Sequence, residues 1–131
     1  MDMEITHVTQ NLPIAPRKLR LVADSVRHQD VNSAMAVLAL LPHKGARLMG
    51  KSLKAAAEMA RDHNLDPATL QIQRLMCNTG RTYKRVIGHS RGRMAGIMKQ
   101  HTHLVLVLSG EELKRTKKAT TPKPAEEQEE K

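Results

Sequence analysis

The chain has 131 residues, a formal net charge of +9, one cysteine, one tyrosine and neither phenylalanine nor tryptophan. A single cysteine excludes a disulfide framework or a cysteine-rich zinc site within the chain, and so few aromatic rings exclude a conventional platform for stacking single-stranded bases. The charge is one-sided, because residues 1–110 hold 16 Lys and Arg against 7 Asp and Glu, whereas residues 111–131 hold 6 of each. This distribution is typical of a protein that binds a polyanion.

The first elements in chain order are a strand and a helix. Residues 3–9 alternate loosely between apolar and polar side chains, which indicates a short strand. A helix is expected to begin at Pro16, because proline fits the first helical turn. Its apolar stripe has the spacing i, i+3, i+4, i+7 and consists of Leu19, Val22, Ala23 and Val26.

The opposite face of this helix carries charged residues at the same spacing. Asp24 is placed to pair with Arg20 and Arg27. That pairing leaves Arg17 and Lys18 as the freer charges at the helix start. We therefore expect this end of the helix to be available to an anionic partner.

Two further helices follow. Residues 31–41 are expected to form a short helix, capped by Asp30 or Asn32 and ended by Pro42. A longer helix over residues 43–64 has an apolar side centred on Met49, Leu53, Ala56 and Ala60. Its opposite side carries Lys44, Arg47, Lys51, Lys54, Glu58 and Arg61. That charged side is either an ordinary solvated surface or an RNA contact, and the sequence leaves both open.

The second half of the chain predicts two strands joined by a long basic insert. Residues 70–78 alternate, and residues 103–109 are apolar at consecutive positions, as in a central strand with both faces covered. The insert, residues 81–103, contains no acidic residue and no sustained alternation that would bury one face. We expect it to be the loop of an extended β-hairpin. Residues 1–110 then form one domain, and residues 111–131, rich in charge and proline, form a disordered tail.

Catalytic and metal-binding chemistry is not indicated. The sequence shows no Ser/His/Asp order and no paired carboxylates, and His101 and His103 on one strand face are too few to hold zinc. Cys77 is expected to be a small buried hydrophobe. We expect no enzyme activity, no cofactor and no metal. Because neither a signal peptide nor a membrane-spanning run is present, a cytoplasmic protein is expected.

Two kinds of nucleic-acid binder fit these features. A helix-turn-helix regulator would use residues 16–28 and 32–41, but its second helix should present polar side chains to base edges, and VNSAMAVLALL has no Lys or Arg. A binder of structured RNA would dock its compact part on the RNA surface and thread the hairpin between RNA elements. A segment without a hydrophobic face then needs no protein core, because RNA supplies its surroundings.

Four segments resemble the bacterial large-subunit ribosomal protein twenty-two family, over about Thr6 to Ser109. They are APRKLRLVADSVR, VNSAMAVL, AAAEMARDHNLD and TYKRVIGHSRGRMAGIMKQHTHLVLVLS. The most specific pieces are the Pro-Arg-Lys-X-Arg-Leu-Val-Ala-Asp helix start, the Lys84-Arg85 pair, the Gly92-Arg93 step and the Thr-X-His before the last strand.

The resemblance implies an α+β fold of three helices packed on a small three-stranded antiparallel sheet, with a long protruding β-hairpin over about residues 79–101. It implies a structural constituent of the large ribosomal subunit that binds rRNA, supports assembly and lines the polypeptide exit tunnel with its hairpin. The expected partners are large-subunit rRNA, neighbouring large-subunit ribosomal proteins and the nascent polypeptide, with no membrane and no homo-oligomer. A non-ribosomal nucleic-acid-binding regulator is the alternative.

The resemblance also assigns residues to roles. The rRNA-binding residues are expected to be Arg17, Lys18, Arg20, Arg81, Lys84, Arg85, Arg91, Arg93 and Lys99. The tunnel-lining tip is expected to consist of Gly88, His89, Ser90, Arg91, Gly92 and Arg93. The chain departs from the family pattern at residues 78–81, 88–90 and 94–96, which makes the tip less charged and more flexible than is typical.

Overall fold

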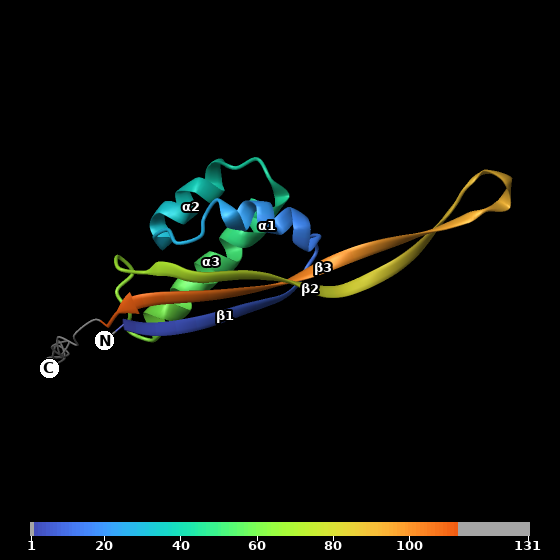
Figure 1. Cartoon of the computed structure of the whole chain (residues 1–131). Helices are drawn as coiled ribbons and strands as arrows, with labels where there is room; N and C mark the ends of the chain where they lie inside the picture. The colour runs from blue at the N-terminus through green and yellow to red at the C-terminus, as the bar shows by residue number, and fades with distance from the viewer. Residues whose placement is uncertain (1, 113–131) are drawn as a thin grey trace, which may run out of the picture.

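A computed structural model of the chain describes residues 2–112. It confirms the α+β class, with three helices and one three-stranded antiparallel sheet from which β2 and β3 extend as a long arm (Figure 1). The elements in chain order are β1 (Asp2–Leu12), α1 (Pro16–Asp24), α2 (Val31–Leu40), α3 (Lys44–Asp62), β2 (Gln71–Gly88), a short 3-10 turn (Ser90–Gly92) and β3 (Met94–Glu111).

The sheet has the order β1-β3-β2, so β3 is the central strand, as its apolar sequence predicts. All pairs are antiparallel, and the core register sets Val8 against Val105 in one pair of strands and Leu75 against Leu106 in the other. Side chains of β3 alternate across the sheet, and Leu104, Leu106 and Leu108 are almost completely buried beneath the helices. This row is the base of the hydrophobic core.

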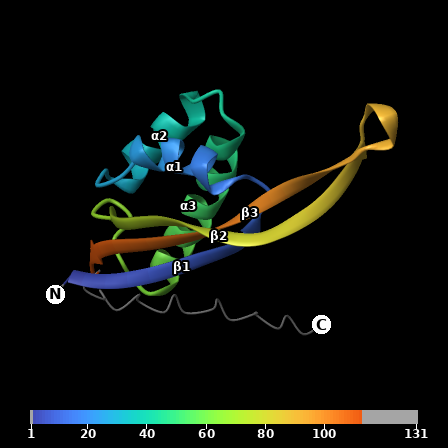
Figure 2. The same cartoon turned by 45° about the vertical axis from the view of Figure 1, so that its right-hand side comes forward.

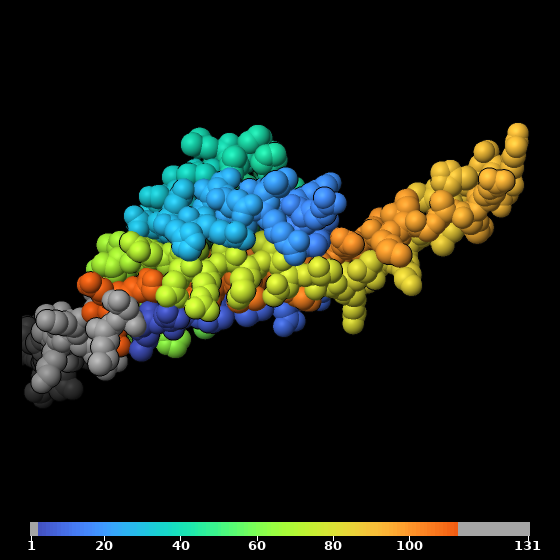
Figure 3. Space-filling model, in the orientation of Figure 1, coloured from blue at the N-terminus to red at the C-terminus, as the bar shows by residue number. Residues whose placement is uncertain are grey.

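The prediction that both faces of the central strand are covered is correct only in part, because on the face turned away from the helices Val107 is buried but the residues beyond it are not. On the face turned away from the helices, Val8 is 49% and Met76 is 43% exposed, and Val105 between them is only half-buried. The space-filling view shows strand residues at the surface below α1 and α2 (Figure 3). A run of consecutive apolar residues therefore does not distinguish a strand covered on both faces from one that leaves a face open.

The helices bury the stripes that their periodicity predicts. The stripe predicted for the first helix is fully buried, although α1 ends at Asp24 and Val26 lies just beyond it. In α3, Met49, Leu53, Ala56 and Ala60 are buried to the same degree. The start of α3 lies directly against α1 at Gly45, where a Cβ would be 3.2 Å from Ile14 Cδ1 and 3.3 Å from Val22 Cγ2. Glycine at this position lets the two helices approach more closely than a side chain would allow.

Two boundaries differ from the prediction. The basic insert is not a loop, since its arms continue β2 and β3 as paired strands and only residues 89–93 turn the chain. At the C-terminal side, Glu111 belongs to β3 and Glu112 forms a bridge with Leu65, so the sheet continues past the expected domain end. The rest of the expected tail, residues 113–131, lies outside the described residues. No helix among residues 2–112 is long and apolar enough to cross a membrane.

Candidate nucleic-acid interface

The hairpin projects beyond the core as a pair of strands with no helix beside it. Its outer register runs from Thr82 opposite Gln100 to Gly88 opposite Met94. At about 3.4 Å per residue these seven rows extend roughly 20 Å. None of the side chains in these rows is buried, and the turned view shows the same isolated arm (Figure 2). Backbone pairing, and not burial of side chains in a core, therefore gives this arm its shape.

A β-bulge separates the arm from the core sheet. The register shifts between Thr79 and Thr82, so Gly80 and Arg81 lie outside the regular pairing. A Cβ on Gly80 would be 3.1 Å from the His101 carbonyl oxygen and 3.1 Å from His103 Nε2, so a larger residue would push the strands apart. Because a bulge bends its strand and increases the local twist, this site sets the direction in which the hairpin leaves the body.

One face of the arm carries the residues that contact each other. The rings of Tyr83 and His101 meet edge to face with centroids 4.8 Å apart, and the Arg85 guanidinium carbon lies 5.8 Å from the centre of the Tyr83 ring. Lys99 is the register partner of Tyr83 and shares this face. Tyr83 is 37% exposed, and its ring is occupied by protein groups, which agrees with the exclusion of a stacking platform.

The other face of the arm carries exposed apolar side chains and two glycines whose backbone is uncovered. Val86, Met94 and Met98 are 65%, 80% and 65% exposed. A Cβ placed on Gly88 or Gly96 would meet no atom within 4 Å, so the backbone at both positions is accessible from this side. Sequence reasoning noticed the basic residues of this segment and missed its exposed apolar ones. The available clue was the presence of apolar side chains in a stretch that has no core to bury them.

The tip is a tight turn with an unusual backbone. Arg91 has a φ of 61° and Gly92 a φ of 69°, so both lie in the left-handed region, which is uncommon for arginine. The amide of His89 donates a hydrogen bond of 2.7 Å to the carbonyl of Arg93 and closes the turn. All five residues from 89 to 93 are exposed, so both arginines of the tip point into solvent.

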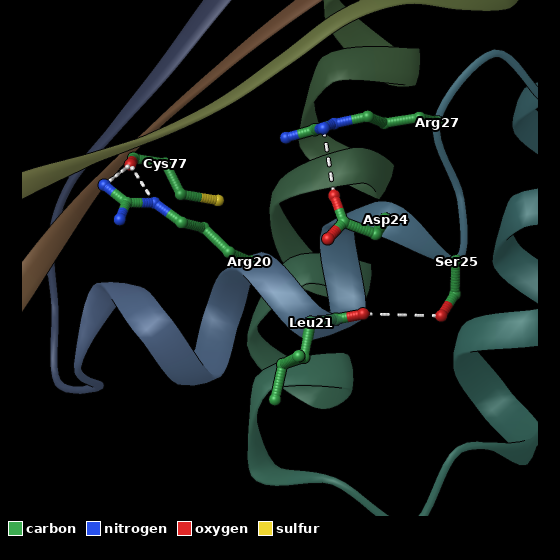
Figure 4. Close-up of polar contacts among 6 residues, drawn as sticks. All are labelled: Arg20, Leu21, Asp24, Ser25, Arg27 and Cys77. Carbon is green, nitrogen blue, oxygen red and sulfur yellow. Dashed lines mark hydrogen bonds and ion pairs between the residues drawn. The ribbon is translucent and has the colours of Figure 1, made fainter.

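Helix α1 and the residues just before it are held at the base of the hairpin by three hydrogen bonds to two backbone carbonyls. The Arg20 guanidinium donates to the Cys77 carbonyl through Nε at 3.2 Å and Nη2 at 3.0 Å (Figure 4). The hydroxyl of Thr102, which is completely buried, donates to the Ile14 carbonyl at 2.6 Å. These contacts hold the start of α1 next to the strands from which the arm grows.

The charges of α1 are partitioned differently from the prediction. Asp24 pairs with Arg27 at 2.9 Å but not with Arg20, whose donors are directed to β2 instead. Arg17 and Lys18 are exposed, as expected. Arg20 is thus engaged within the protein, and the cations of this helix that are offered to a partner are Arg17 and Lys18.

Helix α3 adds a second basic surface. Its six predicted charged residues are all exposed, and Arg61 pairs with Glu58 at 3.1 Å. Within residues 2–112, the side chains of Lys44, Arg47, Lys51 and Lys54 form no ion pair. The structure confirms the position of this face and leaves its two interpretations, solvated surface or RNA contact, both open.

Cys77 lies buried on β2, as predicted. Burial raises the pKa of its thiol, and the nearby positive charge of Arg20 opposes that rise only in part. The thiol is therefore a packing group rather than a reactive one. Among residues 2–112, His, Cys, Asp and Glu side chains form no cluster of three that could hold a metal ion.

The basic residues thus form two separated groups. Lys84, Arg85 and Lys99 lie on the inner half of the arm, while Arg91 and Arg93 lie at its distant tip. From Pro67 to Gly110 no acidic residue interrupts them. An exposed, acid-free arm of this kind is suited to contact with phosphates on several sides.

Comparison with known proteins decides among the classes of nucleic-acid binder. The family model described as ribosomal protein L22p/L17e matches residues 7–109. The chain belongs to this ribosomal protein family. It is 35% identical to the large ribosomal subunit protein uL22 of Roseiflexus castenholzii over 113 residues, which cover 85% of this chain and 100% of that protein. It is also 35% identical to the uL22 proteins of Thermomicrobium roseum and Borrelia duttonii, over 81% and 79% of this chain and 91% and 88% of theirs.

Membership in the L22 family makes the chain a structural component of the large ribosomal subunit and not an enzyme. The family resemblance read from the helix start and the hairpin is thereby confirmed. The helix-turn-helix interpretation is not supported, because the chain belongs to a ribosomal protein family and α2 (Val31–Leu40) has no Lys or Arg to present to DNA.

Proposed function

We propose that the protein binds large-subunit rRNA through the start of α1 and the two faces of the hairpin, and supports assembly of the subunit. The observation that carries this proposal is the arm itself, which is exposed on all sides, acid-free and without a core of its own. A protein segment of this composition buries little apolar surface when it folds alone. When RNA surrounds it, its cations contact phosphates and its apolar side chains are removed from water.

The residues proposed for rRNA contact divide by position. Arg17 and Lys18 contact RNA beside the body of the protein. Contacts along the arm come from Lys84, Arg85 and Lys99, and contacts near the tip come from Arg91 and Arg93. Arg81 lies in the bulge between the body and the arm. Arg20, proposed from the sequence for the same role, acts mainly by fixing α1 to β2 through the Cys77 carbonyl. The remaining N–H groups of its guanidinium can still reach a phosphate.

The tip, residues 88–93, is proposed to line the polypeptide exit tunnel and to face the nascent chain. The length of the arm supports this role, since the tip lies roughly 20 Å beyond the first regular row of the arm. The neighbouring large-subunit proteins and rRNA would hold the body. Shortening the turn between Gly88 and Met94 is expected to spare assembly and to alter nascent-chain pausing or the response to tunnel-binding macrolides.

The test of rRNA binding is the salt dependence of affinity for large-subunit rRNA. With roughly 5–8 phosphate contacts, log affinity should fall linearly and steeply with log salt concentration. Replacing Arg17 and Lys18 by alanine should weaken binding and reduce the slope by about 2. The matched control replaces Lys51 and Lys54 on α3, which removes the same charge from the surface whose role is open.

Each outcome of that comparison has a meaning. A flat salt dependence of the unmodified protein would contradict binding led by phosphate contacts. Equal losses for the two double variants would show that the start of α1 has no special role in affinity, because the α3 surface or net charge then contributes as much. Both variants alter exposed side chains only, so their melting temperatures should match that of the unmodified protein.

A further inference from the structure

A cavity of about 330 Å³ lies between α1 and the start of α3. Its apolar wall includes Ile14, Val22, Leu41 and Leu21. Leu21 is 73% exposed, and Figure 4 shows its side chain directed away from the strands, on a different side of α1 from Arg20. A leucine in this position is neither core nor ordinary solvated surface, since it forms part of an open hollow.

The charged groups around this cavity are all cationic. Lys18 of α1 and Lys44 of α3 line it, and no carboxylate does. Within residues 2–112 neither lysine side chain forms an ion pair, and Asp24, the acidic residue of α1, is already paired with Arg27. The ligand that fits is therefore one with a flat or compact apolar part and a negative charge beside it.

We propose that this cavity holds an unpaired nucleotide of large-subunit rRNA, with the base against Leu21 and the flanking phosphates between Lys18 and Lys44. The inference rests on the proposed rRNA binding and gives it a defined subsite. A cavity of about 150 Å³ is enough for benzene, so 330 Å³ admits the two fused rings of a purine. Proteins that recognise structured RNA commonly accept such splayed-out bases.

Polar groups at the cavity edge suit a base as well. Ser25 and His43 both line it, and they offer a hydroxyl and an imidazole to the hydrogen-bonding edge of a nucleobase. The Ser25 hydroxyl donates a 3.4 Å hydrogen bond to the Leu21 carbonyl and can still accept one from a base, whereas a purely apolar side chain would use neither it nor the two lysines. The chemistry of the lining therefore favours a nucleotide over a protein side chain.

The first test identifies what touches Leu21 in assembled subunits. A photoreactive diazirine analogue of leucine is placed at position 21 of the full chain, and the same analogue at position 86 serves as a control on the hairpin. After irradiation and digestion, mass spectrometry should find a nucleotide attached at position 21. An amino-acid adduct there, or none, overturns the inference. A nucleotide adduct at position 86 in the same experiment would show that rRNA binding itself stands.

The second test compares two exposed leucines. Leu21→Gln should weaken binding to large-subunit rRNA about tenfold, the effect of losing one well-buried apolar contact. Leu40→Gln, which changes a leucine that is 84% exposed and outside this cavity, should leave affinity within about twofold. Equal affinities of the two variants contradict the subsite. An unmodified chain that does not bind rRNA contradicts the proposed function and the subsite together.

Discussion

Replacing Thr102 by valine isolates one hydrogen bond at the base of the hairpin. The side chain is completely buried, and its hydroxyl donates to the Ile14 carbonyl at 2.6 Å. Valine has nearly the same shape, so the change removes the donor without opening a cavity, and it leaves the carbonyl without this partner. A buried group left unsatisfied in this way costs about 1–3 kcal/mol. For a domain of this size, we expect the melting temperature to fall by roughly 5–15 °C.

Thermal and urea unfolding of the full chain measure this effect directly. Thr6→Val is the matched control, because Thr6 is exposed on β1 and the same atoms are exchanged there without a buried partner. Its stability should stay within about 0.5 kcal/mol of the unmodified protein. If Thr102→Val is as stable as that control, the hydroxyl does not fix the start of α1 to β3, and the described geometry of the hairpin base is wrong.

Four further predictions concern stability, thiol reactivity and backbone motion. Arg20→Met should lower the free energy of unfolding by about 1–2 kcal/mol in urea, because the Cys77 carbonyl loses a charged donor. An unchanged urea midpoint would show that the bonds from Arg20 to Cys77 do not hold α1 on β2. The raised pKa of Cys77 means less thiolate at pH 8 than in a free cysteine, so a disulfide reagent should modify it only as fast as the protein opens. Free in solution, residues 82–100 should show lower amide order parameters than residues 104–108, and deleting residues 113–131 should change stability by less than about 0.5 kcal/mol.

The elements with a buried face were predictable from the sequence. In α1 and α3 the helical period separates apolar from charged residues, and both stripes are buried as expected. Strand order could be inferred because the β3 sequence is apolar at consecutive positions, which favours a central strand. Side-chain periodicity predicts these elements correctly because burial against the core requires apolar residues at these positions.

Features that depend on distant backbone were not predictable. Arg20 bonds to a carbonyl 57 residues away, and a rule based on helical spacing assigns it to Asp24 instead. The pairing of the hairpin arms depends mainly on backbone groups, so a sequence without a buried face resembles a loop. Gly45 lines the cavity beside Leu21 and lies directly against α1, and no local sequence pattern predicts that contact.

The open face of the sheet shows a second limit. Residues 103–109 are apolar on both sides of the strand, yet on the side away from the helices Val107 is buried and Val105 is only half-buried. An apolar pattern indicates which side chains are buried in the functional state. It does not indicate whether they are buried against protein or against RNA. In a chain of the L22 family, where large-subunit RNA is the proposed surrounding, the same ambiguity extends to Val86, Met94 and Met98 on the arm.

The most direct test of the central claim is co-sedimentation of the full chain with the large ribosomal subunit through a high-salt gradient. The account predicts one copy per large subunit, retained after washing, with the hairpin arms protected from protease. Replacing Arg17 and Lys18 together by alanine should reduce the amount of protein retained on the subunit without unfolding it. A chain that sediments alone, or one whose arms stay open to protease in the subunit fraction, would contradict an rRNA-embedded hairpin.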